Sequence, residues 1–137
     1  MADLSTTYMG IPLKNPLILG ASNLVSQAET VRLLEEAGIA AIVYKSLFEE
    51  QVQLESLQLI EELSEYEERS AEMARIFPSL EHAGTKEHLL NLRKMKEMTT
   101  IPVIGSLNAV YEPTWVEYAR ELEKTGIDGL EINLYAI

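Results

Sequence analysis

A lysine, two asparagines and several small or hydroxylated residues stand directly after short apolar runs of this chain. The positions concerned are Ala21, Ser22, Lys45, Ser46, Asn108 and Asn133. If the runs are parallel strands, these residues gather at the carboxyl edge of one sheet, where α/β proteins place their binding sites. The set offers a cation, amides and hydroxyls but no nucleophile paired with a base. Such a set suits the binding of a cofactor better than it suits acid–base catalysis.

Lys45 and Asn133 each close a strongly apolar run. A charge or an amide at the end of a buried strand is costly unless it finds a partner. An internal repeat matches residues 32–45 with residues 120–133 and puts Lys45 and Asn133 at corresponding positions. We therefore expect both side chains to point toward one mouth. The competing interpretation is a Lys45 that simply reaches solvent.

Several other chemistries lack the residues that they need. The chain contains no Gly-x-Gly, no Gly-x-Ser-x-Gly and no cysteine, and its only aspartates are Asp3 and Asp128. These absences exclude the glycine-rich nucleotide-binding fingerprints, the hydrolase nucleophile elbow and thiolate metal sites. His82 and His88 lack a glutamate three residues earlier, so we expect solvated histidines rather than metal ligands.

The apolar runs predict four parallel strands with helices between them. The strands are expected near residues 16–20, 39–45, 101–106 and 129–134. Gly38 and Gly126 each follow a helical pattern at the position where a left-handed residue ends a helix. One helix is expected over 27–37, with Ser26 and Glu29 as a capping box, and another from Pro113.

Residues 47–98 form a long excursion between the second and third strands. Apolar residues at helical spacing predict one long amphipathic helix that Pro78 ends, and Thr85 is expected to cap a second helix running to Lys96. The glutamates of the excursion, Glu49 and Glu50 among them, are expected on a solvated face.

The element order predicts an α/β fold. Residues 1–14 are expected to form a β-hairpin at the bottom of a barrel, and residues 15–137 its first four βα steps. A complete (β/α)8 TIM barrel needs about 250 residues, so we expect the 137 residues to be a single partial domain, the N-terminal half of such a barrel. A compact, four-stranded doubly wound domain is the alternative.

Charge and hydropathy restrict the partners. The formal net charge is −11, which argues against nucleic acid because a polyanion requires a basic surface. The longest apolar runs are strand-length, so no membrane helix is expected, and the N-terminus has no secretion signal. We expect a cytoplasmic protein.

Four stretches carry a resemblance to a known family. Residues 4–22, 41–46, 101–108 and 129–134 resemble the dihydroorotate dehydrogenase family of FMN-dependent (β/α)8 barrels. The resemblance implies FMN as cofactor and dihydroorotate or a related pyrimidine as substrate. It implies that Ala21 and Ser22 contact the flavin ring, that Lys45 lies near its N1–C2 edge, and that Asn133 bonds flavin or substrate. Ser46 and Asn108 would complete the same shell.

Three departures from the family pattern limit the implied activity. The acidic excursion replaces the pyrimidine-binding loop after the second strand, and Ala136 stands where some members carry a cysteine base. The loops of the seventh and eighth strands, which hold the FMN phosphate, are not in the sequence. We expect an oxidoreductase of pyrimidine biosynthesis that is inactive as this isolated half, for want of its C-terminal half or of a second copy. The alternatives are a non-catalytic, self-associating half-barrel and a barrel enzyme of another class.

Overall fold

The computed structural model describes residues 2–50, 53–54, 57 and 83–134. The elements in chain order are β1 (Thr6–Tyr8), β2 (Ile11–Leu13), β3 (Ile18–Leu19), the short 3-10 helix η1 (Asn23–Ser26), α1 (Ala28–Ala37), β4 (Ala41–Val43), β5 (Leu47–Phe48), α3 (Ala83–Met98), β6 (Val103–Asn108), α4 (Glu112–Glu123) and β7 (Gly129–Ile132). An antiparallel hairpin, β1–β2, precedes a parallel sheet. The predicted α/β fold class is confirmed.

The sheet follows the chain order of the predicted strands, because β3 pairs with β4, β4 with β6, and β6 with β7. The short strand β5 was not predicted, and it continues β4 along the same edge of β6. Val43 pairs with Ile104 and Leu47 pairs with Leu107. Three residues, Tyr44–Ser46, therefore lie opposite only two residues of β6, Gly105 and Ser106. One extra residue in one of two paired strands is the geometry of a β-bulge.

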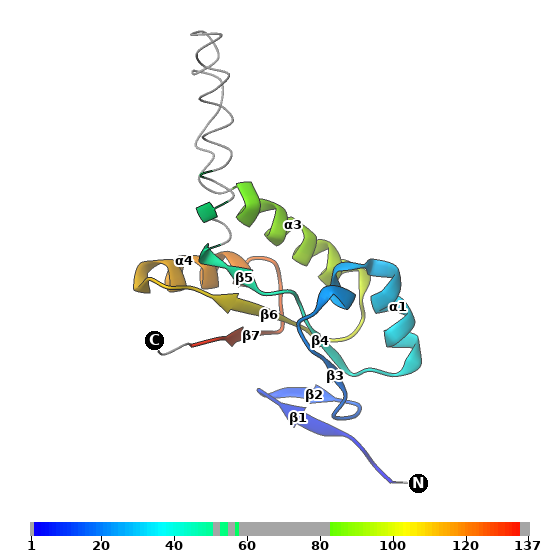
Figure 1. The fold of residues 1–137 in the computed structure, drawn as a ribbon. Helices are drawn as coiled ribbons and strands as arrows, with labels where there is room; N and C mark the ends of the chain where they lie inside the picture. Colours follow the sequence, from blue (N-terminus) through cyan, green and yellow to red (C-terminus); the bar gives the residue numbers. More distant parts are fainter. Residues whose placement is uncertain (1, 51–52, 55–56, 58–82, 135–137) are drawn as a thin grey trace, which may run out of the picture.

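The helices α1, α3 and α4 cover one face of the sheet (Figure 1). On that face Val103 and Leu107 of β6 pack with Val31 of α1, Leu92 of α3 and Leu122 of α4, and all five side chains are buried. Side chains alternate along a strand, so Ile104 and Ser106 of β6 face the opposite side of the sheet. We call this opposite side the inner face.

The hairpin covers the inner face at the end where the strands begin. Leu13 packs with Ala40 and Ala41 at the start of β4. A Cβ placed on Gly129, the first residue of β7, would lie 2.7 Å from the Met9 Cε atom. The predicted hairpin within residues 1–14 is present, and it lies at the lower end of the sheet in Figure 1, near the starts of the strands.

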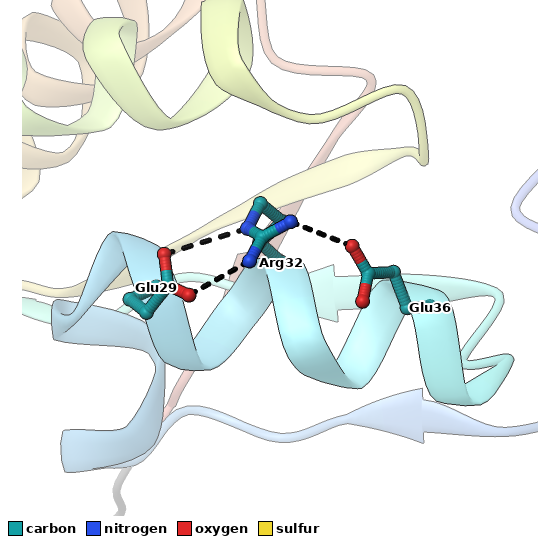
Figure 2. Close-up of polar contacts among 3 residues, drawn as sticks. All are labelled: Glu29, Arg32 and Glu36. Atoms are coloured by element: carbon teal, nitrogen blue, oxygen red, sulfur yellow. Dashed lines mark hydrogen bonds and ion pairs between the residues drawn. The ribbon is translucent and has the colours of Figure 1, made fainter.

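Helix α1 begins differently from the prediction. The capping residue is Gln27, whose side chain makes no capping hydrogen bond, and Ser26 belongs to η1 instead. The predicted capping box is therefore wrong, and Figure 2 shows the reason. Arg32 pairs with Glu29 at 2.8 Å and with Glu36 at 2.7 Å, so the Glu29 carboxylate is turned along the helix instead of back toward its start.

The predicted end of α1 is confirmed. Gly38 has a φ of +110° and its N–H donates to the carbonyls of Leu34 and Glu35. Alanine in this left-handed region is strained, so Gly38→Ala should lower the free energy of unfolding by about 1–2 kcal/mol. Chemical denaturation measures the change. Gly20→Ala is the matched control, because Gly20 has no such φ and a Cβ there would meet nothing within 4 Å; an equal loss in the two variants would contradict the prediction.

Helix α3 begins earlier than predicted. It starts at Ala83, so Thr85 lies within the helix and is buried rather than capping it. Leu92 and Met95 face the core, as their spacing indicated. Of the long helix predicted to end at Pro78, the described residues 49–50, 53–54 and 57 are helical; the rest of that prediction, together with His82, lies outside the described residues. Among the residues that the structure describes, no helix has both the length and the apolar character to span a membrane.

Candidate functional site

Four polar side chains meet on the inner face near the carboxyl ends of the strands. The Ser106 hydroxyl donates to the Glu131 Oε1 atom at 3.0 Å and accepts from the Asn133 Nδ2 atom at 3.1 Å. Its oxygen lies 2.7 Å from the Ser46 Oγ atom. Because the single Ser106 proton is directed at Glu131, the Ser46 hydroxyl is the donor in that pair. We call Ser46, Ser106, Glu131 and Asn133 the inner-face cluster.

Strand register brings the cluster together. Ser106 pairs with Glu131 across β6 and β7, and paired residues of parallel strands project to the same face. Asn133 follows two residues later, and its backbone N–H donates to the Leu107 carbonyl at 3.0 Å. The bulge between β4 and β5 places Ser46 at the level of Ser106. The three strands thus present the cluster as one hydrogen-bonded unit.

Asn108 lies two residues beyond Ser106 on the same strand, and therefore on the same face. Its side chain is 5% exposed, and its Oδ1 atom has no hydrogen-bond partner among the described residues. A buried acceptor without a donor costs about 1–3 kcal/mol. The arrangement therefore suits a ligand that offers an N–H or O–H group at this height above the cluster.

Lys45 lies elsewhere. It is the middle residue of the bulge, is exposed, and lines a cavity beside His88 on the helix-covered side of the sheet. The Lys45 charge also acts on His88. Burial is the main cause that lowers the pKa of His88 to about 4, and the nearby Lys45 charge lowers it further. The structure therefore links Ser46, not Lys45, to Asn133, and the link runs through the Ser106 hydroxyl. The internal repeat could not show this, because the extra residue of the bulge shifts the register.

Ala21 and Ser22 lie just past the carboxyl end of β3, at the opposite edge of the sheet from β7. Both are exposed. Within the described part of the chain, no hydrogen bond joins Ser22 to the inner-face cluster. These two residues therefore border the same end of the sheet without contacting the polar centre.

Two residues of the cluster, Ser106 and Glu131, were not among the predicted site residues. Each had a signal in the sequence: a serine and a glutamate stand in the middle of runs that are otherwise apolar. A polar side chain in such a strand needs a partner. Here each supplies the other's partner, and the hydrogen bond to Glu131 fixes the direction of the Ser106 hydroxyl.

Glu49 is buried, contrary to the prediction of a solvated face. It is 2% exposed, and its Oε2 atom accepts from the backbone N–H groups of Val110, at 2.6 Å, and Tyr111, at 3.2 Å. Its Oε1 atom accepts from Thr114 at 2.9 Å and from Gln53 at 3.0 Å. The carboxylate thus caps the start of α4, whose own capping residue makes no side-chain bond.

His88 is also not the solvated histidine that was predicted. Its ring packs edge-on against Tyr44, with centroids 5.5 Å apart, and its Nε2 atom is buried without a hydrogen-bond partner among the described residues. The reason is that His88 lies on the face of α3 that turns toward the sheet, one turn before Leu92.

Sequence comparison with known proteins finds relatives of this chain. No family model matches the chain. The dihydroorotate dehydrogenase B (NAD(+)) catalytic subunit of Thermoplasma acidophilum is 31% identical over 134 residues, and that of Thermoplasma volcanium is 28% identical over the same number. Both matches cover 98% of this chain but only 42% of the relative. The chain is thus related in sequence, over almost its whole length, to a part of the catalytic subunits of the dihydroorotate dehydrogenase family.

Proposed function

We propose that this chain supplies the first four βα steps of a flavin-dependent oxidoreductase of the dihydroorotate dehydrogenase type. The strand order, the hairpin beneath the sheet and the two Thermoplasma relatives support this proposal. Its substrate is then dihydroorotate or a closely related pyrimidine, and its place is in pyrimidine biosynthesis. The chain spans about two fifths of its relatives' length, so we assign the remaining βα steps to further sequence.

The single observation that carries the proposal is the buried Asn108 Oδ1 atom, which has no hydrogen-bond partner among the described residues and lies two residues along β6 from Ser106 of the inner-face cluster. Flavin and pyrimidine rings both carry an in-plane N–H beside a carbonyl, which matches an amide flanked by further donors and acceptors. Ser46 and Asn133 would bond the edge of the ring. When bound, FMN supplies the hydride chemistry that these side chains lack.

Lys45, Ala21 and Ser22 are assigned supporting roles. A cation near the ring stabilises the negative charge that a reduced flavin carries. Lys45 adjoins Ser46, and its long stem allows its amine to turn from the outer cavity over the carboxyl end of the sheet. The exposed backbone at Ala21 and Ser22 leaves room for a flat ring to approach.

These 137 residues alone are expected to show no turnover. By the resemblance to the family, Ala136 stands where some members would carry a cysteine base, and an alanine side chain cannot accept a proton. Catalysis in the whole protein then depends on a base from elsewhere.

The absorption spectrum of the full-length protein tests the proposal. We expect a flavin band at about 450 nm, and we expect Asn108→Ala to weaken flavin retention about tenfold or more, because a hydrogen bond to a buried acceptor is lost. Asn91→Ala is the matched control, since Asn91 is exposed on α3. A purified protein without the band, or equal retention in the two variants, would reject the proposal.

A second candidate is a self-associating half-barrel without catalysis. The observation in its favour is a groove of about 560 Å³ beside β7, which pairs only with β6 in the described part of the chain. Val116 and Ile132 in this groove are each half exposed. Sedimentation separates the candidates: a compact dimer of the 137-residue chain favours association, and a stable monomer opposes it.

A further inference from the structure

A second cavity lies on the helix-covered side of the sheet, between the start of α1 and the length of α3. It has a volume of about 480 Å³. We call it the outer cavity; of the inner-face cluster, only Ser46 is among its described lining residues. Its α3 wall is formed by residues that recur every three or four positions and so share one helix face: Glu87, His88, Asn91, Lys94, Met95 and Met98.

The described lining of the outer cavity carries more positive than negative side chains. Among these residues Lys45 and Lys94 stand against one carboxylate, that of Glu87, whereas the whole sequence carries a net charge of −11. Asn91 lies three residues before Lys94, so the amide and the ammonium are neighbours on the helix surface. Such a pair can donate to both oxygens of one carboxylate.

The rest of the described cavity wall combines Ser26 and Ser46 with an apolar, partly fixed part. Phe48, Met95 and Met98 line it, and methionine side chains adapt readily to flat apolar groups. The His88 ring is held edge-on against Tyr44. Its lowered pKa keeps it uncharged near neutral pH, so it contributes an aromatic surface rather than a third cation.

We propose that the outer cavity binds a small organic carboxylate with a flat apolar body. Asn91 and Lys94 hold the carboxylate, while Met95, Met98 and the His88 ring contact the body. The cavity shares Lys45 and Ser46 with the proposed flavin shell. Asn91 and Lys94, which hold the carboxylate, take no part in that shell, so the two proposals are tested independently.

Benzoate is the probe, and its neutral analogue benzamide is the matched ligand. Titration of the 137-residue chain, followed by calorimetry and by the imidazole resonances, should show saturable benzoate binding that shifts the His88 signal. Benzamide should bind at least about tenfold more weakly, the equivalent of one lost charge-assisted contact. Inorganic phosphate should bind weakly as well, because it lacks the apolar body.

The variant Lys94→Met should weaken benzoate binding about tenfold. Lys86→Met is its control, since it removes the same charge from the same helix at an exposed position outside the cavity. The proposal is overturned by equal binding of benzoate and benzamide, by equal losses in the two lysine variants, or by no saturation at millimolar benzoate. Circular dichroism shows that each variant is folded before its affinity is compared.

Discussion

Replacing Glu49 with alanine should lower the free energy of unfolding by about 3–5 kcal/mol, among the largest effects of any single substitution outside the apolar core. The carboxylate is almost fully buried and accepts hydrogen bonds from Val110, Tyr111 and Thr114. Alanine would leave two backbone N–H groups at the start of α4 without an acceptor. It would also remove the negative charge that interacts favourably with the positive end of that helix.

Glu50→Ala is the matched control, because Glu50 is the next residue and is exposed. Urea denaturation should give a near-unchanged midpoint for Glu50→Ala and a large drop for Glu49→Ala. Glu49→Gln should fall between them, since the amide oxygen can still accept from the Val110 and Tyr111 N–H groups while its NH2 group replaces the oxygen that accepts from Thr114 and Gln53. Equal midpoints for the two alanine variants would show that the Glu49 bonds contribute nothing to stability.

The general architecture could be predicted because it depends on local patterns. Gly38 ends α1 with a positive φ, as its place after a helical pattern required, and Gly126 likewise has a φ of +85°. The apolar runs became parallel strands in the predicted order, and β4 and β6 are buried at every position. Such features follow from a few neighbouring residues, so a single sequence is enough to reveal them.

The site could be predicted only in part because it depends on register and long-range contacts. Because of the bulge at Tyr44–Ser46, Ser46 rather than Lys45 bonds to Ser106, which also bonds Asn133. No local sequence pattern reveals this bulge. Glu49 is 61 and 62 residues away from Val110 and Tyr111, whose N–H groups donate to it, so the sequence shows only another glutamate in an acidic stretch. Glu29 shows the converse. The sequence contains the Ser26–Glu29 capping-box motif, but the Glu29 carboxylate forms an ion pair with Arg32 instead.

His88 should make the protein lose stability as the pH falls from about 6.5 to about 4. Burial, with a smaller contribution from the Lys45 charge, lowers its pKa in the folded state to about 4 from the ordinary value of 6.5. Above pH 6.5 the imidazole is neutral in both the folded and the unfolded chain. Between the two values the unfolded chain binds a proton that the folded chain does not, so acid favours unfolding, by about 3 kcal/mol in total.

His88→Phe should remove this pH dependence, since phenylalanine keeps the edge-on contact with Tyr44 but does not titrate. The free energy of unfolding is measured by urea denaturation at several pH values, and the difference between wild type and variant isolates the histidine from carboxylates and from His82, which both proteins share. Lys45→Met should show a pH dependence of stability between those of wild type and His88→Phe. Removing the cation raises the His88 pKa, so the pH range over which stability is lost becomes narrower. Parallel stability curves for wild type and His88→Phe from pH 7 to pH 4 would mean that the imidazole is not buried as described.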